Sequence, residues 1–156
     1  MTGMSARTQL DTFIDKYSPE VAAVAREALA KMQDRLPGTV ELVYDNYNAL
    51  AIGFGPSERT SEAIFSIALY PRWVTLFFLQ GARLRDPHGL LKGSGKVVRH
   101  IVLKDACTLD EAAVRELMAQ ALDNAEVRMD AGQPGRLVIK SVSAKQRPRV
   151  AKSVVS

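Results

Sequence analysis

The chain has 156 residues, of which 47% are hydrophobic and 24% are charged, with a formal net charge of +4. This length suits one domain with a core that needs neither disulfides nor metals, and the single cysteine, Cys107, excludes an intramolecular disulfide. No apolar run approaches the roughly 20 residues of a membrane-spanning helix, and residues 1–10 lack a signal-peptide pattern. We therefore expect a cytoplasmic protein that makes no membrane contact and carries no cofactor.

Two amphipathic helices are predicted at the start of the chain. Thr8 is a suitable N-cap, and apolar residues recur at helical spacing from Leu10 to Tyr17. Ser18-Pro19 restarts the chain as a cap and a first helical residue, and Pro37-Gly38 ends the second helix. Both helices are predicted to cover the core.

Five strands are predicted next, and one helix closes the domain. The β-prone runs are residues 39–44, 49–54, 63–69, 73–79 and 97–103. The third and fourth runs are apolar on both faces, so we expect them to be central. Residues Thr108 to Glu111 match a capping box that opens the closing helix. Because the strands are grouped and do not alternate with helices, the order predicts an α+β fold with a mainly antiparallel sheet.

The C-terminal stretch differs from the rest in charge. Residues 136–156 have six basic residues and no acidic one, which leaves 15 basic and 17 acidic residues, a net charge of −2, in residues 1–135. We divide the chain into a domain of residues 8–129 and a basic tail of residues 130–156, in which the β-prone run 137–139 can add an edge strand. Such a tail either contacts a polyanion such as nucleic acid or docks in part on its own domain.

The loop between the last two predicted strands is the first candidate site. It is basic and glycine-containing, so its backbone N–H groups and cations can face an anion. The residues assigned to ligand binding are Arg83, Lys92, Gly93, Gly95, Lys96 and Arg99. The loop does not match a Walker phosphate-binding motif, because Val97 follows the lysine and a strand follows in place of a helix. The alternative is a glycine-rich turn with solvated charges.

Other chemistry has little support in the sequence. His88 and His100 are the only histidines, no nucleophile-elbow motif occurs, and one Cys with two separated His gives no zinc-ligand spacing. The sequence therefore does not favour an enzyme. Aromatic residues on or near the sheet offer another option, since an uncovered sheet face can stack a base or hold an apolar ligand. Tyr44 and Tyr47, which flank a polar turn, are the aromatic residues expected to be exposed.

Several short elements follow one another in the second half of the domain. They are Ala68-Leu69-Tyr70, Leu76-Phe77-Phe78, Gly81-Ala82, Leu84, Asp86-Pro87, Leu90-Leu91, Gly93, Gly95-Lys96, Arg99 and Ile101. With these elements and the flanking helices, the chain resembles the YdhG-like family of unknown function over about residues 8–125. The end of the chain, residues 139–149, resembles a tail found in one branch of that family. The resemblance implies a small intracellular α+β domain.

Three hypotheses result for the function. The first is a non-enzymatic domain whose basic loop binds an anionic small molecule or protein. The second comes from the resemblance, since one type of family member has been described as a frataxin-like iron chaperone; here Asp11, Asp15 and Glu20 would hold the iron. The third is nucleic-acid contact through the basic tail. A homodimer is a further option, because strands that are apolar on both faces need a cover.

Overall fold

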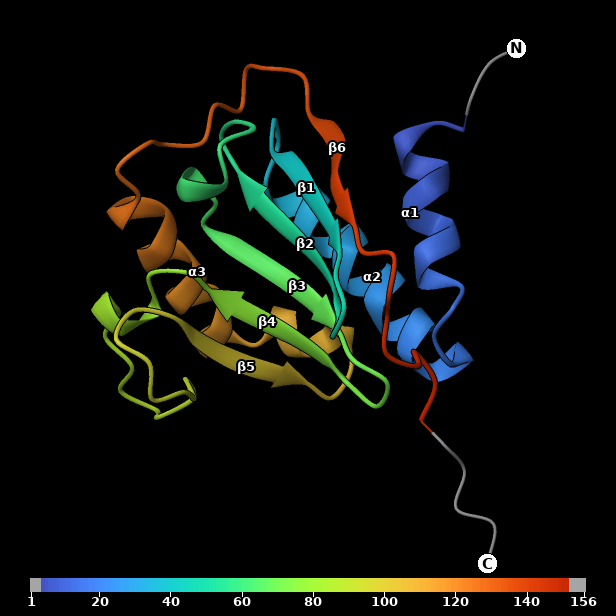
Figure 1. Ribbon diagram of the computed structural model, residues 1–156. Coiled ribbons are helices and arrows are strands. Elements are labelled where there is room, and N and C mark those ends of the chain that lie inside the picture. Colours follow the sequence, from blue (N-terminus) through green and yellow to red (C-terminus); the bar gives the residue numbers. More distant parts are fainter. Residues whose placement is uncertain (1–3, 152–156) are drawn as a thin grey trace, which may run out of the picture.

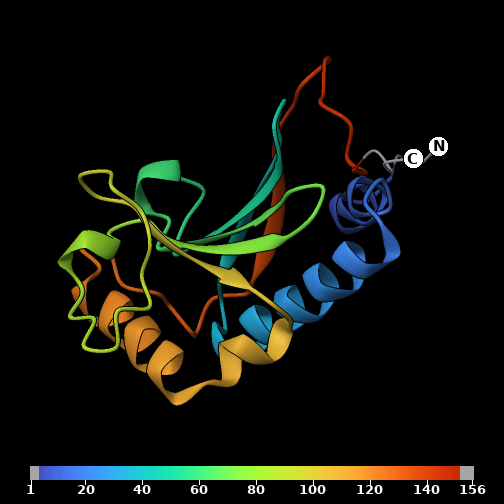
Figure 2. The same ribbon diagram turned by 90° about the horizontal axis from the view of Figure 1, so that it is seen from below.

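The helices lie on one face of a six-stranded sheet, and they leave the other face open (Figure 1, Figure 2). The computed structural model describes residues 4–151. The helices are α1 (Ala6–Ile14), α2 (Pro19–Arg35) and α3 (Ala112–Asn124), with the short 3-10 turns η1 (Thr60–Glu62), η2 (Gly81–Arg83) and η3 (Ala106–Asp110). The strands are β1 (Val40–Asp45), β2 (Leu50–Gly55), β3 (Phe65–Leu69), β4 (Val74–Phe78), β5 (Arg99–Leu103) and β6 (Arg136–Val142). The α+β class is thus confirmed.

The sheet has the strand order β5-β4-β3-β2-β1-β6. Strands β1 to β5 pair antiparallel with their neighbours, and β3 and β4 are interior strands, as expected. The sheet differs from the five-stranded prediction by β6, which pairs parallel with β1. The apolar run Leu137–Ile139 completes the edge of β1, so part of the predicted tail belongs to the sheet. A boundary at residue 130 therefore cuts between two strands that share hydrogen bonds.

Two predicted helix caps are wrong. Helix α1 begins at Ala6, because the Ser5 side chain accepts a hydrogen bond from the backbone N–H of Thr8. The capping box at Thr108 does not form: Asp105 caps η3, and α3 starts only after Glu111, which makes no side-chain cap bond. The 3-10 segment η3 thus occupies the residues that the predicted capping box placed at the start of the helix. By contrast, Ser18 caps α2 and Pro19 opens it, as expected.

The core lies between the sheet and the helices. One row of aliphatic residues crosses the sheet in register, and each strand contributes one residue to it. The row is Ile139, Val43, Ile52, Ile67, Leu76 and Ile101. Ala25, Ala28 and Met32 of α2 are fully buried, and they belong to the same core cluster. The small alanine side chains let α2 approach the sheet closely, which fills the core at the density of protein interiors.

The face of the sheet that the helices leave open carries small side chains at its centre. The two central rows are Tyr44, Ala51, Ala68, Thr75, Val102 and Leu42, Gly53, Ser66, Phe77, His100. Side chains alternate between faces along a strand, so these residues all lie opposite the helix-covered core. Figure 2 shows the helices below the sheet and this face above it, with β1 and β6 curving upward. Ala63 packs over Gly53 at one end of this face, and the small residues Ala51, Ser66 and Ala68 leave the other end hollow.

Tyr17, just after α1, joins the first helix to the sheet. Its hydroxyl donates a hydrogen bond to the Leu69 carbonyl and accepts one from the Leu50 N–H, both at 3.1 Å. Burial, the largest effect, raises the pKa of this hydroxyl from 10.0 to about 12. Because the folded protein holds the proton more tightly than the unfolded chain does, this stabilisation is complete below pH 10 and is lost as the pH rises from 10 to 12.

We therefore expect wild type to lose about 2 to 3 kcal/mol more stability than Tyr17→Phe between pH 10 and 12, since each pKa unit corresponds to about 1.4 kcal/mol. Urea denaturation of both proteins from pH 8 to pH 12 measures this difference. Titration of the other tyrosines and lysines affects both proteins alike and cancels in the comparison. Parallel loss of stability in the two proteins contradicts the prediction.

Candidate functional site

A hollow of about 500 Å³ lies on the open face, at the end of the sheet where the β1–β2 and β3–β4 turns meet. Ala51, Ala68 and Ser66 line it from the sheet, and Phe77 lines it from β4. The two turns and the chain after β6 supply the remaining walls: Asn46, Tyr47, Asn48, Ala49, Tyr70 and Ser143. The lining is thus aromatic and amide-rich, and it contains no carboxylate.

The two turns position the aromatic side chains of this hollow. In the β1–β2 turn, the Asn46 N–H donates to the Ala49 carbonyl at 3.0 Å, which leaves Tyr47 at the tip. In the β3–β4 turn, the Tyr70 N–H donates to the Trp73 carbonyl at 2.9 Å, with Pro71 and Arg72 between them. Asn, Pro and Arg suit such exposed turn positions. Figure 2 shows both turns raised above the open face of the sheet.

The aromatic rings are accessible although they are large. Tyr47 is 49% exposed and Trp73 is 46% exposed. The rings of Tyr70 and Trp73 stack at 5.5 Å with an interplanar angle of 29°. Burial raises the pKa of the Tyr70 hydroxyl above its ordinary value of 10.0. Exposed aromatic faces of this kind are platforms for stacking a planar ligand.

The charge beside the hollow is positive. The Arg147 guanidinium lies 5.8 Å from the centre of the Tyr47 ring, and Arg72 is exposed in the turn between Tyr70 and Trp73. Lys145 is also exposed, two residues after the hollow-lining Ser143. The carboxylates of α1 and α2 lie behind the sheet, on its helix-covered side (Figure 2). An anionic ligand with planar groups therefore fits this end of the sheet in both charge and shape.

The predicted basic loop projects from the other end of β4 and β5 (Figure 1). Lys92 pairs with His100 through two backbone hydrogen bonds of 2.8 and 2.9 Å. Its ammonium contacts only the Gly89 carbonyl, at 3.5 Å. Lys96 and Gly95 are exposed, and nothing lies within 4 Å of a Cβ built on Gly95. Two of the predicted cations are thus accessible, but they stand on a projecting loop.

The other predicted loop residues have structural partners. The Arg99 guanidinium donates to the carbonyls of Gly95 and Val98, so it holds its own loop together. Gly93 adopts a φ of 121°, in the left-handed region that favours glycine. Arg83 lines a different hollow of about 310 Å³, between η2, residues 61–64 and the end of α3. The structure therefore does not gather Arg83 and Arg99 around one ligand position.

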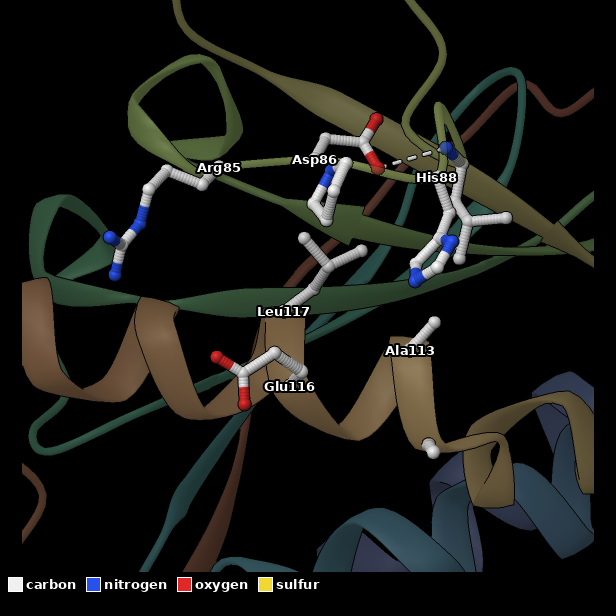
Figure 3. A pocket seen from close by; sticks show the side chains of 9 residues that line it. Arg85, Asp86, His88, Ala113, Glu116 and Leu117 are labelled. Atoms are coloured by element: carbon white, nitrogen blue, oxygen red, sulfur yellow. Dashed lines mark hydrogen bonds between the residues drawn. The ribbon is translucent and has the colours of Figure 1, made fainter.

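A smaller hollow of about 200 Å³ lies between residues 85–90 and α3 (Figure 3). The His88 ring points toward Ala113, and the Glu116 carboxylate lies on the far side of Leu117. Asp86 accepts hydrogen bonds from the backbone N–H groups of Leu90 and Leu91 at 2.9 Å, so it organises the loop. The residues lining this hollow include no Ser, Thr or Cys next to the imidazole. His88 therefore has no nucleophile to activate at this position.

Two of the three carboxylates considered for iron form ion pairs with Arg26. Asp11 and Asp15 of α1 both accept hydrogen bonds from Arg26 of α2, at 2.9 and 2.5 Å. Both hydrogen bonds raise the pKa of Arg26, and the bond to Asp15 has the larger effect. Glu20 is exposed in the first turn of α2. Within residues 4–151, no three His, Cys, Asp or Glu side chains gather in a way that could hold a metal ion.

The basic tail follows the surface of its own domain as far as it is described. Arg136 forms an ion pair with Glu58 at 3.1 Å, and Lys140 donates to the Glu58 carbonyl. Arg149 is buried against Asp45 at 2.9 Å. Lys152 lies outside the described residues. The described part of the tail thus docks on its own domain, and contact of its exposed cations with a polyanion stays a prediction.

The hollow on the open face was only partly predictable from the sequence. The exposure of Tyr47 was expected from the polar turn around it, but the joining of Tyr47, Tyr70 and Phe77 depends on strand order. Small residues occupy every second position of β2 and β3: Ala51 and Gly53 in β2, and Ser66 and Ala68 in β3. This alternation indicates a sheet face that carries few large side chains.

None of the protein-family models, curated proteins and solved structures compared with the chain matches it. The resemblance to the YdhG-like family thus stays a prediction. In residues 4–151, no helix has both the length and the apolar character needed to cross a membrane.

Proposed function

We propose that the protein binds single-stranded nucleic acid on the open face of its sheet. Bases stack on Tyr47, Tyr70 and Phe77, and Arg72 and Arg147 contact phosphates. The observation that carries this proposal is the hollow itself: aromatic walls, a floor of small residues and no lining carboxylate, with cations beside it.

Stacking supplies the first part of the argument. An aromatic side chain that stacks a base contributes about 1–3 kcal/mol, whatever the base. Tyr47 stands at the tip of one turn and Tyr70 in the other, with the floor residues Ala51 and Ala68 between them. Because the floor side chains are small, a planar group can lie between the turns without displacing protein atoms.

Charge supplies the second part. Arg72 and Arg147 are both exposed. Arg72 lies between Tyr70 and Trp73 in the chain, and Arg147 lies over the Tyr47 ring. Guanidinium groups form paired hydrogen bonds with phosphate oxygens and also stack on aromatic faces. The third sequence hypothesis, nucleic-acid contact through the tail, thus gains a surface on which the strand can continue.

Single strands fit the site better than duplexes. A duplex offers its bases only at the groove edges, so their faces cannot reach Tyr47 or Phe77. An unpaired strand exposes every base face and follows a basic path with little sequence preference. The asparagine amides of Asn46 and Asn48 line the same hollow and can donate to and accept from base edges.

The direct test is a titration of the full-length protein with fluorescently labelled single-stranded RNA and DNA of mixed sequence, followed by anisotropy. A duplex of the same sequence and free mononucleotides are the comparison ligands. Trp73, the only tryptophan, stacks on Tyr70 at the site, so its fluorescence should change on binding. Binding of the single strands with a steep salt dependence supports the proposal; binding of duplex alone, or of nothing, overturns it.

A carboxylate on the floor of the hollow should weaken this binding strongly. Ala51→Glu places a negative charge beside the stacked bases and phosphates, and we expect affinity to fall by about a hundredfold or more, since charge repulsion across a binding face costs several kcal/mol and each step of about 1.4 kcal/mol is a factor of ten. Ala23→Glu is the matched control: it makes the same charge change at an exposed position of α2, behind the sheet. Anisotropy titrations of both variants measure the difference, and equal affinities contradict the site.

The same titration separates the hollow from the basic loop. A Lys92→Ala/Lys96→Ala variant removes the two accessible loop cations without touching the sheet face. If this variant loses binding while Ala51→Glu keeps it, the anion site is the loop that the sequence suggested. Loss in Ala51→Glu alone assigns binding to the hollow.

A further inference from the structure

We infer that the C-terminal strap, residues 143–150, is the element that holds Tyr47 in its binding position, and that the buried Arg149 anchors the strap. This inference rests on the proposed function, because it gives Arg149 a role in a site that it does not contact. Arg149 is thus a positioning residue for the stacking surface. No property of the strap's sequence other than its charge suggested this role.

The β1–β2 turn depends on the strap for its hydrogen bonds. Within the turn, the Asn46 N–H donates to the Ala49 carbonyl. The carbonyls of Asp45 and Tyr47 instead accept hydrogen bonds of 2.8 Å from the backbone N–H groups of Ser143 and Arg147, respectively. The Gln146 side chain adds a second donor to the Asp45 carbonyl, at 3.2 Å. The strap therefore satisfies backbone groups that the hairpin leaves without partners.

Arg149 fixes the strap from inside. Its Nη2 donates to the Asp45 carboxylate at 2.9 Å and to the Asn46 carbonyl at 2.5 Å, and its Nη1 donates to the Tyr47 carbonyl at 3.5 Å. Its guanidinium also lies 5.6 Å from the centre of the Tyr17 ring. One buried side chain thus contacts three consecutive residues of the turn that carries the aromatic platform.

These contacts connect a buried ion pair to an exposed binding surface. The Arg149 side chain is 4% exposed and that of Asp45 is fully buried, so neither can reach a ligand on the open face. Tyr47 is 49% exposed, and its ring lies against the guanidinium of Arg147, a residue of the strap. When the anchor is lost, only the backbone bonds of Ser143 and Arg147 and the Gln146 side chain hold the strap to the turn, and we expect Tyr47 to leave the edge of the hollow more readily.

The experiment compares two variants of the full-length protein with wild type. Asp45→Asn/Arg149→Met removes the anchor and both buried charges together, so no unpaired charge stays in the interior and the fold is retained. Arg147→Ala removes an exposed cation and leaves the anchor intact. Amide hydrogen exchange of residues 45–49 is measured without ligand, and affinity for labelled single-stranded RNA is measured from 50 to 300 mM salt.

For the double variant we expect faster exchange in residues 45–49 than in wild type, with exchange in β3 unchanged, and affinity weaker by about tenfold or more, because the Tyr47 stacking surface is lost and the released strap carries Arg147. Arg147→Ala should lower the slope by about 0.7, the value for one phosphate contact on a single strand, and leave exchange in residues 45–49 as in wild type. Unchanged exchange in residues 45–49 overturns the inference whether or not nucleic acid binds. If exchange is faster in the double variant but the wild type does not bind nucleic acid, the proposed function is rejected and the anchor role is supported. If exchange is faster but the double variant binds with full affinity, the role of the anchor in nucleic-acid binding is rejected.

Discussion

The double variant Tyr47→Ala/Phe77→Leu should bind single-stranded nucleic acid at least about thirtyfold more weakly than wild type, since each lost base stack costs about 1–3 kcal/mol. Tyr47 is exposed at a turn, so its removal leaves the core intact. Phe77 is partly buried on the open face, and leucine keeps most of its volume while removing the ring. Anisotropy titration with labelled single-stranded RNA measures the loss.

The matched control for this variant is Phe13→Leu. Phe13 is also partly buried and lies on α1, behind the sheet, beneath the Lys16 ammonium. This change removes an aromatic ring of the same type with no effect expected on affinity. The salt slope of the double variant should match that of wild type, because stacking involves no counterion release. A double variant that binds as tightly as Phe13→Leu would exclude the hollow as the binding surface.

Arg149→Ala should be the most destabilising single change of a charged residue, with a loss of about 3 to 5 kcal/mol. The physical reason is the partner left behind: Asp45 is fully buried, and without Arg149 its nearest cation is Lys16, at 3.5 Å. The loss of the bonds to the Asn46 and Tyr47 carbonyls adds to this cost. Urea denaturation of the variant and wild type at pH 7 measures the difference.

Asp45→Asn/Arg149→Met serves as the control for that measurement. Because it removes both charges, it should recover most of the stability that Arg149→Ala loses. Arg147→Ala, two residues away and exposed, should change the stability by less than about 0.5 kcal/mol. A loss below about 1 kcal/mol in Arg149→Ala would mean that water or Lys16 compensates Asp45, and that the strap is not anchored as the geometry indicates.

The distribution of charge explains why one face of this protein suits a polyanion. The acidic residues of α1 and α2 form ion pairs or face solvent behind the sheet, as in the contact of Arg26 with Asp11 and Asp15. The C-terminal stretch brings its basic residues to the hairpin end of the sheet, where Arg147 lies over Tyr47. Of the tail cations, Arg147 and Lys145 are exposed beside the hollow, whereas Arg136 and Arg149 pair with Glu58 and Asp45.

The sequence by itself determined the helices, the first five strands and the central place of β3 and β4. These features depend on local patterns, because helical and strand periodicities are read within a few residues. The exposed turn at Tyr47 followed from the same kind of local signal, since the polar residues around it favour a turn.

Only the tertiary structure decided the rest. The β6 strand pairs with β1 across about a hundred residues of chain, and Arg149 reaches Asp45 over a separation of 104 positions. The same holds for Arg26, whose contact with Asp11 and Asp15 turned a candidate metal site into an ion pair. Such contacts depend on which elements become neighbours and on which face of the sheet the helices cover. Burial of the whole apolar surface determines which elements become neighbours, so this arrangement cannot be predicted from a local pattern of residues.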